Sequence, residues 1–262
     1  MKILIATFTY PPESNGVSHV AHAHAIGFVQ RGHEVTVVTA TNRNRNLEEL
    51  KKERIKVFEF DVKGNGNIKV GYSGEIKKYQ DFIAGSKADV MLFHCWQTWS
   101  TDLAIPVFSM NKAKKILVSH GVSANSILSL RNTVSWLCWR PYIWKMQEMI
   151  KTFDHIVFLS QRKDKDRFYD YHLVQKMGLS NYSIIPNGTY PLEHNKYLEH
   201  NEYKIAFKKK FIINTKYIIL QVANYDFRKN QKMALEAFVE SKVKDASLVF
   251  IGSQKNSYTN KL

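Results

Sequence analysis

Residues 1–40 read MKILIATFTYPPESNGVSHVAHAHAIGFVQRGHEVTVVTA. This stretch begins with a short apolar run, passes through a turn with two prolines, continues with helical spacing and ends in a second β-branched run at 34–39. A strand, a long helix and a second strand in this order are typical of parallel strands joined by a crossover helix. The opening stretch therefore predicts an α/β fold.

The same alternation continues to residue 188. We predict strands at 2–7, 34–39, 55–60, 89–94, 114–120, 155–160 and 182–186, with helices at 17–31, 74–86, 98–111, 126–152 and 161–177. Pro141 is expected to kink or split the fourth helix, because proline cannot donate a backbone hydrogen bond. This series predicts one doubly wound parallel sheet with helices on its faces.

A second unit follows a polar stretch. Residues 189–203, TYPLEHNKYLEHNEY, contain no strand pattern and indicate a linker. Beyond it we predict a strand at 217–222, a helix at 229–241 and a strand at 247–252. One such unit cannot cover both faces of its own sheet. The predicted domains are thus residues 1–188, the linker 189–203 and an incomplete second Rossmann-like domain at 204–262.

The composition indicates a globular protein with an anionic partner. Apolar residues make up 44% and charged residues 23% of the chain, which excludes a disordered or disulfide-scaffold class. The formal charge of +15 favours a phosphate-bearing ligand, an anionic membrane surface or nucleic acid. Nucleic acid is the least favoured, because we find no helix-turn-helix, zinc-finger or RNP-like motif. An ordinary lysine-rich solvated face is the simpler alternative.

The cysteines and the hydropathy pattern bear on the compartment. Cys95 and Cys138 are isolated, have no metal-ligand spacing and are expected to be buried thiols in a reducing compartment. The apolar run at the start is too short for a signal sequence, and no run approaches the ~18 apolar residues of a membrane span. We expect a cytoplasmic protein that is not integral to a membrane.

The connection after the first strand is a candidate binding loop. Residues 7–20, TFTYPPESNGVSHV, place Asn15 and Gly16 at the start of a helix. Glycine there permits close approach of a ligand, and the free N–H groups of a helix start favour an anion. The loop lacks the GxGxxG pattern of dinucleotide-binding proteins, and a simple tight turn is the alternative.

Four motifs in order carry a resemblance to a known family. They are RGHEVTVVT at 31–39, VSHG at 118–121, IIPNG at 184–188 and ILQVANYDFRKNQKMALEAF at 219–238. With the opening strand and loop, they resemble the retaining glycosyltransferases of the GT-B fold, family 4 (glycosyl transferases group 1). The resemblance implies two Rossmann-like domains, the acceptor bound mainly by the first and a nucleotide sugar mainly by the second. It also implies retention of the anomeric configuration, no metal and no cofactor.

The resemblance also implies roles for individual residues. His120 is implied as the catalytic residue beside the donor sugar. The implied donor and phosphate residues are Asn15, Gly16, Asn187, Gly188, Arg228 and Lys229. Cations there suit the chemistry, because transfer builds negative charge on the departing nucleoside diphosphate while the sugar becomes oxocarbenium-like.

Two departures from the family pattern concern the donor site. An arginine is frequent in the family where this chain has Asn224. The family's later pair of glutamates, eight positions apart, has no counterpart in the sequence. Half of the donor site is therefore expected to come from a longer product or from a second chain.

Histidines and tryptophans allow further interpretations. Of His19, His22 and His24, only the first two share a helix face, so a histidine-rich helix is preferred to a metal site. His94 ends a strand as His120 does; a core position with its hydrogen bonds satisfied is expected, and a position facing the cleft is the alternative. All five tryptophans lie between 96 and 144. The candidate acceptor or membrane surface is Trp136, Trp139, Arg140, Trp144 and Lys145, and core aromatic packing is the alternative.

These observations predict an enzyme that moves a sugar, with retention, from a nucleotide diphosphate donor to a glycan or lipid-linked acceptor. Surface polysaccharide synthesis at the inner membrane face is the expected setting. The first alternative is a non-catalytic acceptor-binding chain that needs a partner chain. The second is a sugar-nucleotide epimerase of the same fold, which would act with no acceptor present.

Overall fold

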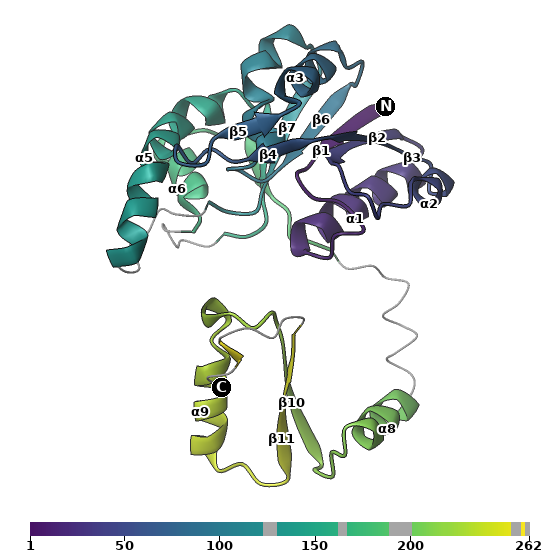
Figure 1. Ribbon diagram of the computed structural model, residues 1–262, viewed down its shortest axis with the longest axis vertical. Coiled ribbons are helices and arrows are strands. Elements are labelled where there is room, and N and C mark those ends of the chain that lie inside the picture. Colours follow the sequence, from purple (N-terminus) through teal and green to yellow (C-terminus); the bar gives the residue numbers. More distant parts are fainter. Residues whose placement is uncertain (123–129, 162–166, 189–200, 253–257, 260–262) are drawn as a thin grey trace. The chain divides into compact units, whose positions relative to one another are not determined.

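The computed structural model describes residues 1–122, 130–161, 167–188, 201–252 and 258–259 (Figure 1). The chain folds into two compact units, Met1–Thr189 and Tyr190–Leu262, called unit 1 and unit 2 below. Each unit has its own sheet and helices and is described by itself.

Unit 1 is built on a seven-stranded parallel sheet with the order β3-β2-β1-β6-β7-β8-β9. Its strands are β1 (Lys2–Ala6), β2 (Glu34–Ala40), β3 (Ile55–Phe60), β6 (Val90–His94), β7 (Lys114–Ser119), β8 (His155–Phe158) and β9 (Tyr182–Ile184). All seven predicted strands are present, which confirms the α/β fold. The chain reverses its direction of winding between β1 and β6, and such a switch point opens a crevice at the carboxyl ends of the strands.

Helices cover both faces of this sheet. On one face, α1 (Gly16–Gln30) and α2 (Leu47–Lys52) pack on a core that includes Ile5, Val37 and Ala25. On the other face lie α3 (Ile76–Gly85), α4 (Trp99–Asp102), the 3-10 helix η1 (Ile105–Met110), α5 (Leu130–Lys151) and α6 (Tyr169–Lys176). Figure 1 shows α1 and α2 together, away from α3, α5 and α6. A small antiparallel pair, β4 (Val62–Gly64) and β5 (Tyr72–Gly74), joins β3 to α3.

Three helix predictions need correction. The helix predicted at 98–111 is interrupted: α4 ends at Asp102, and the separate η1 begins at Ile105 with Pro106 in its first turn, where proline is tolerated. Pro141 does not split α5, which runs unbroken past it. Leu137, whose carbonyl loses its partner at this proline, is 55% exposed, so water can take that bond. The helix predicted at 161–177 begins only at Tyr169, and residues 162–166 lie outside the described chain.

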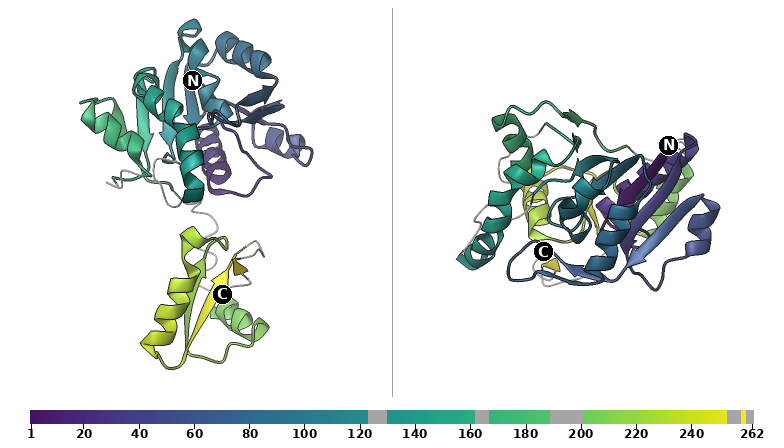
Figure 2. Two further views of the ribbon diagram at one scale, coloured as in Figure 1. Left: turned by 60° about the vertical axis from the view of Figure 1, so that its left-hand side comes forward. Right: turned by 90° about the horizontal axis from the view of Figure 1, so that it is seen from above.

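Unit 2 contains one parallel strand pair with helices on either side. The order is α8 (Asn201–Lys210), β10 (Tyr217–Val222), the 3-10 helix η2 (Phe227–Lys229), α9 (Gln231–Ser241) and β11 (Ala246–Ile251). Figure 2 shows α9 and α8 flanking the strands from both sides. Apolar side chains of β10 remain exposed, with Leu220 at 52% and Val222 at 68%. The helix α8 begins inside the stretch predicted as a linker, of which 189–200 lie outside the described residues.

Candidate functional site

A cavity of about 440 Å³ lies at the carboxyl ends of the strands that flank the switch point. It follows β1, β6 and β7 and is bordered by the start of α1, by the β4–β5 hairpin and by α5. Among the described residues, its lining consists of aromatic, small apolar and neutral polar residues, and no charged side chain takes part: Phe8, Val17, Gly64, Asn65, Cys95, Trp96, Gln97, Thr98, Trp99, His120, Gly121 and Trp139. We call it the switch-point pocket.

The start of α1 reaches this pocket through Val17. Asn15 is the N-cap of α1, because its side-chain oxygen accepts a hydrogen bond from the Ser18 backbone N–H at 3.0 Å. Its amide nitrogen donates to the Thr9 hydroxyl at 2.7 Å and so ties the helix start to the loop after β1. Gly16 is exposed, with open space where a Cβ would stand. The side chain of Asn15 is thus engaged in capping, whereas the backbone at Gly16 stays open to a ligand.

The turn after β6 has a strained backbone. Cys95 and Gln97 have φ values of 70° and 62°, in the left-handed region that residues other than glycine rarely adopt. The Thr101 hydroxyl donates to the Cys95 carbonyl at 2.6 Å and stabilises the turn. Burial raises the pKa of the Cys95 thiol to about 12, so the thiol stays protonated and is no nucleophile. Strain of this kind is typical of functional sites and here shapes one wall of the pocket.

The carboxyl group of Asp102 ties together three segments around the pocket. It accepts a hydrogen bond from the hydroxyl of Tyr72 on β5 and another, at 2.6 Å, from Tyr142 on α5. The Tyr142 hydroxyl in turn accepts the backbone N–H of Gln97 at 2.8 Å. Burial raises the pKa of Asp102 to about 7, although the two tyrosines and Gln97 lower it. This acid therefore changes its charge near neutral pH while holding the strained turn.

A second buried acid supports the end of β7. Asp170, at the start of α6, is 1% exposed and accepts hydrogen bonds from Trp96 Nε1 at 3.0 Å and from the Ser119 hydroxyl. The Ser119 hydroxyl accepts the backbone N–H of Gly121 at 3.1 Å. Burial, the largest cause, raises the pKa of Asp170. Asp170 thus fixes the residues on either side of His120 and one aromatic wall of the pocket.

His120 itself is half-buried and directly follows β7. Its Nε2 lies 3.2 Å from Nδ1 of His94, the last residue of β6. Burial first, and His24 second, lower the pKa of His120 to about 4. The ring is therefore neutral at pH 7, so its functions there are those of an uncharged hydrogen-bonding group. His94 is fully buried, as expected of a core residue.

The remaining predicted site residues lie elsewhere. Asn187 and Gly188 are exposed and follow β9, and neither lines the switch-point pocket. Lys229 closes η2 in unit 2 with an exposed side chain, while its carbonyl accepts the Gln221 amide at 2.9 Å. The side chain of Arg228 lies outside the described residues. His120 therefore lines the pocket, Asn15 and Gly16 begin the helix that reaches it through Val17, and Lys229 belongs to the other unit.

The tryptophan-rich helix α5 divides between core and surface. Trp139 lines the pocket and packs edge-on against Tyr142. Arg140 stacks on the ring of Trp136, 4.1 Å from its centre. Trp144 is 72% exposed and Lys145 beside it is exposed as well. Of the predicted surface residues, Trp139 thus lines the pocket, and only Trp144 and Lys145 have exposed side chains.

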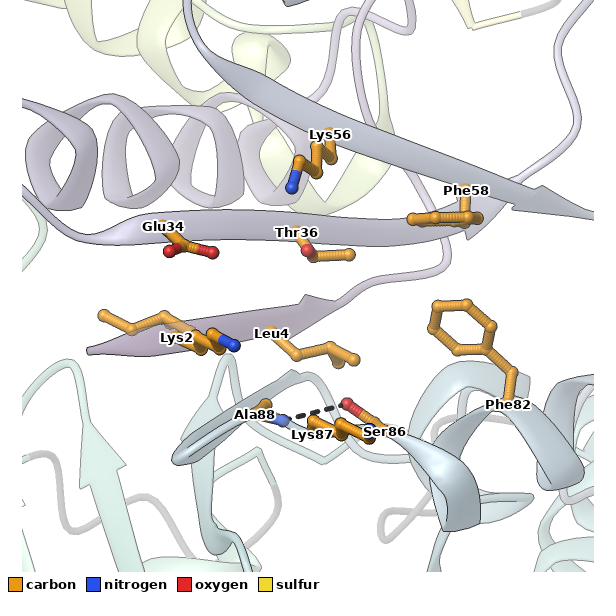
Figure 3. A pocket seen from close by; sticks show the side chains of 11 residues that line it. Lys2, Leu4, Glu34, Thr36, Lys56, Phe58, Phe82, Ser86, Lys87 and Ala88 are labelled. Atoms are coloured by element: carbon orange, nitrogen blue, oxygen red, sulfur yellow. Dashed lines mark hydrogen bonds between the residues drawn. The ribbon is translucent and has the colours of Figure 1, made fainter.

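A smaller cavity, of about 260 Å³, lies at the opposite, amino ends of β1, β2 and β3 (Figure 3). Lys2, Glu34 and Lys56 line it together with Phe58 and Phe82, whose rings lie 4.9 Å apart. It contains none of the candidate residues. Because parallel α/β sheets bind ligands at the carboxyl ends of their strands, we assign the functional site to the switch-point pocket.

Two histidines of α1 lie within hydrogen-bond distance of neighbouring side chains. His22 Nε2 lies 2.9 Å from Glu53, and His19 lies 3.3 Å from the Ser14 hydroxyl. Among the residues that the structure describes, no group of three or more potential ligands is arranged to hold a metal ion. Across the same residues, no helix combines the length and the apolar character needed to cross a bilayer.

Comparisons with known proteins agree with this geometry. The family model of Glycosyltransferase Family 4 matches residues 14–190. No curated protein sequence matches the chain. A glycosyltransferase from Rickettsia africae is 19% identical in sequence with a TM-score of 0.68, and the match covers 99% of this chain and 63% of that one.

Two further structures have the same arrangement. The catalytic domain of starch synthase IV from Arabidopsis thaliana, bound to ADP and acarbose, is 12% identical with a TM-score of 0.60, over 99% of this chain and 70% of that one. WaaG, a glycosyltransferase involved in lipopolysaccharide biosynthesis, is 17% identical with a TM-score of 0.57, over 97% and 64%. These similarities confirm the predicted GT-B fold. The chain spans less than two thirds of the length of the Rickettsia protein and of WaaG.

Proposed function

Because the chain belongs to glycosyltransferase family 4, we propose that it serves the transfer of a sugar, with retention, from a nucleotide diphosphate donor to a glycan or lipid-linked acceptor. Unit 1 provides the pocket for the reacting sugars, and unit 2 provides part of the donor site. No metal or cofactor takes part.

The observation that carries this proposal is the chemistry of the switch-point pocket. Among the described residues, its lining combines aromatic rings with neutral hydrogen-bonding groups and contains no charged side chain. A neutral, polyhydroxylated ligand suits such a lining, because each hydroxyl finds a polar partner and no buried charge is left unpaired. Among the related folds, starch synthase IV was solved with ADP and acarbose, a nucleotide together with a carbohydrate.

Charge for the donor phosphates comes from two features. The backbone at Gly16 presents the open N–H groups of a fifteen-residue helix, which favour an anion. Lys229 adds an exposed ammonium group in unit 2. Features of this kind stabilise the negative charge that grows on a leaving nucleoside diphosphate as the sugar departs.

A peripheral contact with an anionic membrane fits the exposed side of α5. Val134, Leu137 and Trp144 are apolar and 55–72% exposed, and Lys145 is exposed beside them. Apolar side chains flanked by lysine favour the surface of an anionic bilayer. This contact would bring a lipid-linked acceptor to the pocket, at the inner face of the membrane and in surface polysaccharide synthesis.

The test is sugar transfer by the purified chain. It is incubated with labelled UDP-, GDP- and ADP-sugars together with glycan or lipid-extract acceptors, and labelled acceptor and free nucleotide are measured. We expect transfer that His120→Ala reduces by at least tenfold without unfolding unit 1. His155→Ala, a half-buried histidine at the amino end of β8 that bonds the Ser183 hydroxyl at 3.0 Å, is the matched control and is expected to keep its activity.

The alternatives predict different products. An epimerase would release a changed sugar nucleotide without any acceptor. An acceptor-binding chain would give turnover only after a second protein is added. Failure to transfer from every donor, with and without a second protein, would contradict the proposed function.

A further inference from the structure

Three histidine rings lie in a row, each tilted against the next, and the row ends in the switch-point pocket. His24 comes from α1, His94 ends β6 and His120 follows β7. The ring centres lie 5.3 Å apart for His24 and His94 and 5.5 Å apart for His94 and His120. His94, in the middle, is fully buried, whereas His120 lines the pocket.

For His94 and His120 to form a hydrogen bond, one of the two facing ring nitrogens must be protonated and the other must not. His94 Nδ1 lies 3.2 Å from His120 Nε2, so one of them donates and the other accepts. His94 is neutral, because burial, then His120, then His24 lower its pKa well below the ordinary value. A neutral imidazole carries one N–H only, so the choice made at this contact fixes both rings.

The far side of His94 decides which ring donates. Its Nε2 is buried without a partner among the described residues. If His120 donated, His94 would have to carry its proton on this Nε2, which would bury an N–H that has no acceptor. If His94 donates from Nδ1, only an unused lone pair is buried. Buried N–H groups without a partner are rarer and costlier than unused acceptors.

We propose that His94 is a positioning residue that holds His120 as the neutral tautomer with its proton on Nδ1. The bond to His94 occupies Nε2, so Nδ1–H is the group that His120 offers to a molecule in the pocket. His120 is then a hydrogen-bond donor toward a ligand oxygen and not a general base. The tautomer follows from the contacts of unit 1 alone, whereas its use on a sugar oxygen rests on the proposed function.

The surroundings of the three histidines support the neutral state assigned to His120. The pKa of His24 is lowered by burial, and that of His120 by burial and by His24. The ring of His94 lies between those of His24 and His120, and among the described residues no carboxylate shifts these three pKa values. An acidic neighbour would have favoured an imidazolium ion, and none of the three has one among these contributions.

The test is long-range ¹H–¹⁵N NMR of the full chain labelled with ¹⁵N-histidine, at pH 7.5 and without substrate. The His120 signals are assigned by their loss in His120→Asn. We expect a protonated Nδ1 and an unprotonated Nε2 for His120, with no change of state down to about pH 5. A protonated Nε2, or an imidazolium ion between pH 6 and 7.5, would overturn the proposal.

Two variants separate positioning from simple packing. His94→Asn keeps an amide donor near the place of Nδ1 and is expected to preserve the His120 tautomer. His94→Phe keeps the ring volume but has no donor, so His120 is expected to become a mixture of both tautomers. An unchanged single tautomer in a folded His94→Phe would overturn the role of His94. If that variant does not fold, the wild-type spectrum still decides, and no outcome depends on sugar transfer.

Discussion

Replacing Asp102 with asparagine tests the charge state of the network beneath the pocket. Burial raises the pKa of this acid from the ordinary 3.8 to about 7. Between these two pH values the folded chain holds a proton that the unfolded chain has released. The contribution of Asp102 to stability is therefore fully present below about pH 4 and is lost as the pH rises through 7.

The magnitude follows from the size of the shift. One pKa unit corresponds to about 1.4 kcal/mol, and about two units of the shift fall between pH 5 and pH 8. The free energy of unfolding of unit 1 should thus fall by about 2–3 kcal/mol over this pH range because of Asp102. The lower figure is expected, because the residue keeps some contact with solvent. The asparagine of Asp102→Asn accepts and donates hydrogen bonds but does not titrate. The stability of this variant should therefore not show this decrease with pH.

Urea unfolding followed by tryptophan fluorescence measures the effect. All five tryptophans lie in unit 1, so the signal reports that unit alone. The buried histidines change stability in the opposite direction, because their pKa values are lowered, but they are present in both proteins and cancel in the difference. The stability of Asp102→Asn relative to the wild type should rise by about 2–3 kcal/mol from pH 5 to pH 8.

Two comparisons complete this experiment. Asp81→Asn removes an exposed acid that pairs with Lys77 on the surface of α3, and it should leave the pH profile unchanged. Tyr142→Phe removes a donor that lowers the pKa of Asp102, so the loss of stability should move to higher pH. A constant difference between wild type and Asp102→Asn at every pH would refute the reasoning, since the acid would then be ionised in the folded chain.

Three further predictions concern the walls of the site and the outer face of α5. Gly121 has a φ of 93°, and a Cβ there would lie 2.8 Å from the Arg167 carbonyl oxygen, so Gly121→Ala should cost about 1–3 kcal/mol in urea unfolding and lower transfer activity. Asp170→Ala leaves two buried donors without an acceptor and should cost about 2–5 kcal/mol, whereas a loss under 0.5 kcal/mol would mean that water replaces the carboxylate. Trp144→Ala should change the free energy of unfolding by less than about 0.5 kcal/mol but weaken co-sedimentation of the protein with anionic vesicles several-fold. Met110→Ala, which removes another exposed apolar side chain, should leave vesicle binding unchanged. Equal vesicle binding by the two variants would contradict the membrane contact.

Much of the framework of unit 1 follows from local sequence patterns. The β-branched runs that begin at Glu34, Ile55 and His155 mark strands that start at those same residues. Helix interiors were harder to predict, because prolines have different effects in different places. Pro106 lies in the separate η1 that follows α4, whereas Pro141 is tolerated inside α5, where the preceding turn is exposed to solvent. The helix α2 was missed, since its six residues give too short a period to recognise.

Only some residues of the candidate site could be predicted from the sequence. His120 was identified through the resemblance and lines the pocket, whereas Asn15 and Gly16 followed from the loop pattern as well and begin the helix that reaches the pocket through Val17. The partners of Asp102 lie 30 and 40 positions away in the sequence, so no local pattern indicates that they meet. The left-handed backbone at Cys95 and Gln97 could not be predicted, because neither residue is a glycine. Such contacts depend on the tertiary fold and become visible only in the structure.

The most direct test of the proposed activity is calorimetric titration of the purified chain with UDP, GDP, ADP and their sugar conjugates. The account predicts that one nucleotide series binds and that Lys229→Ala raises its dissociation constant about 10- to 100-fold, as expected for a charged hydrogen bond to phosphate. Lys216→Ala, which removes another exposed lysine of unit 2, should leave the affinity unchanged. Binding that Lys229→Ala does not affect, or no binding of any nucleotide, would contradict it.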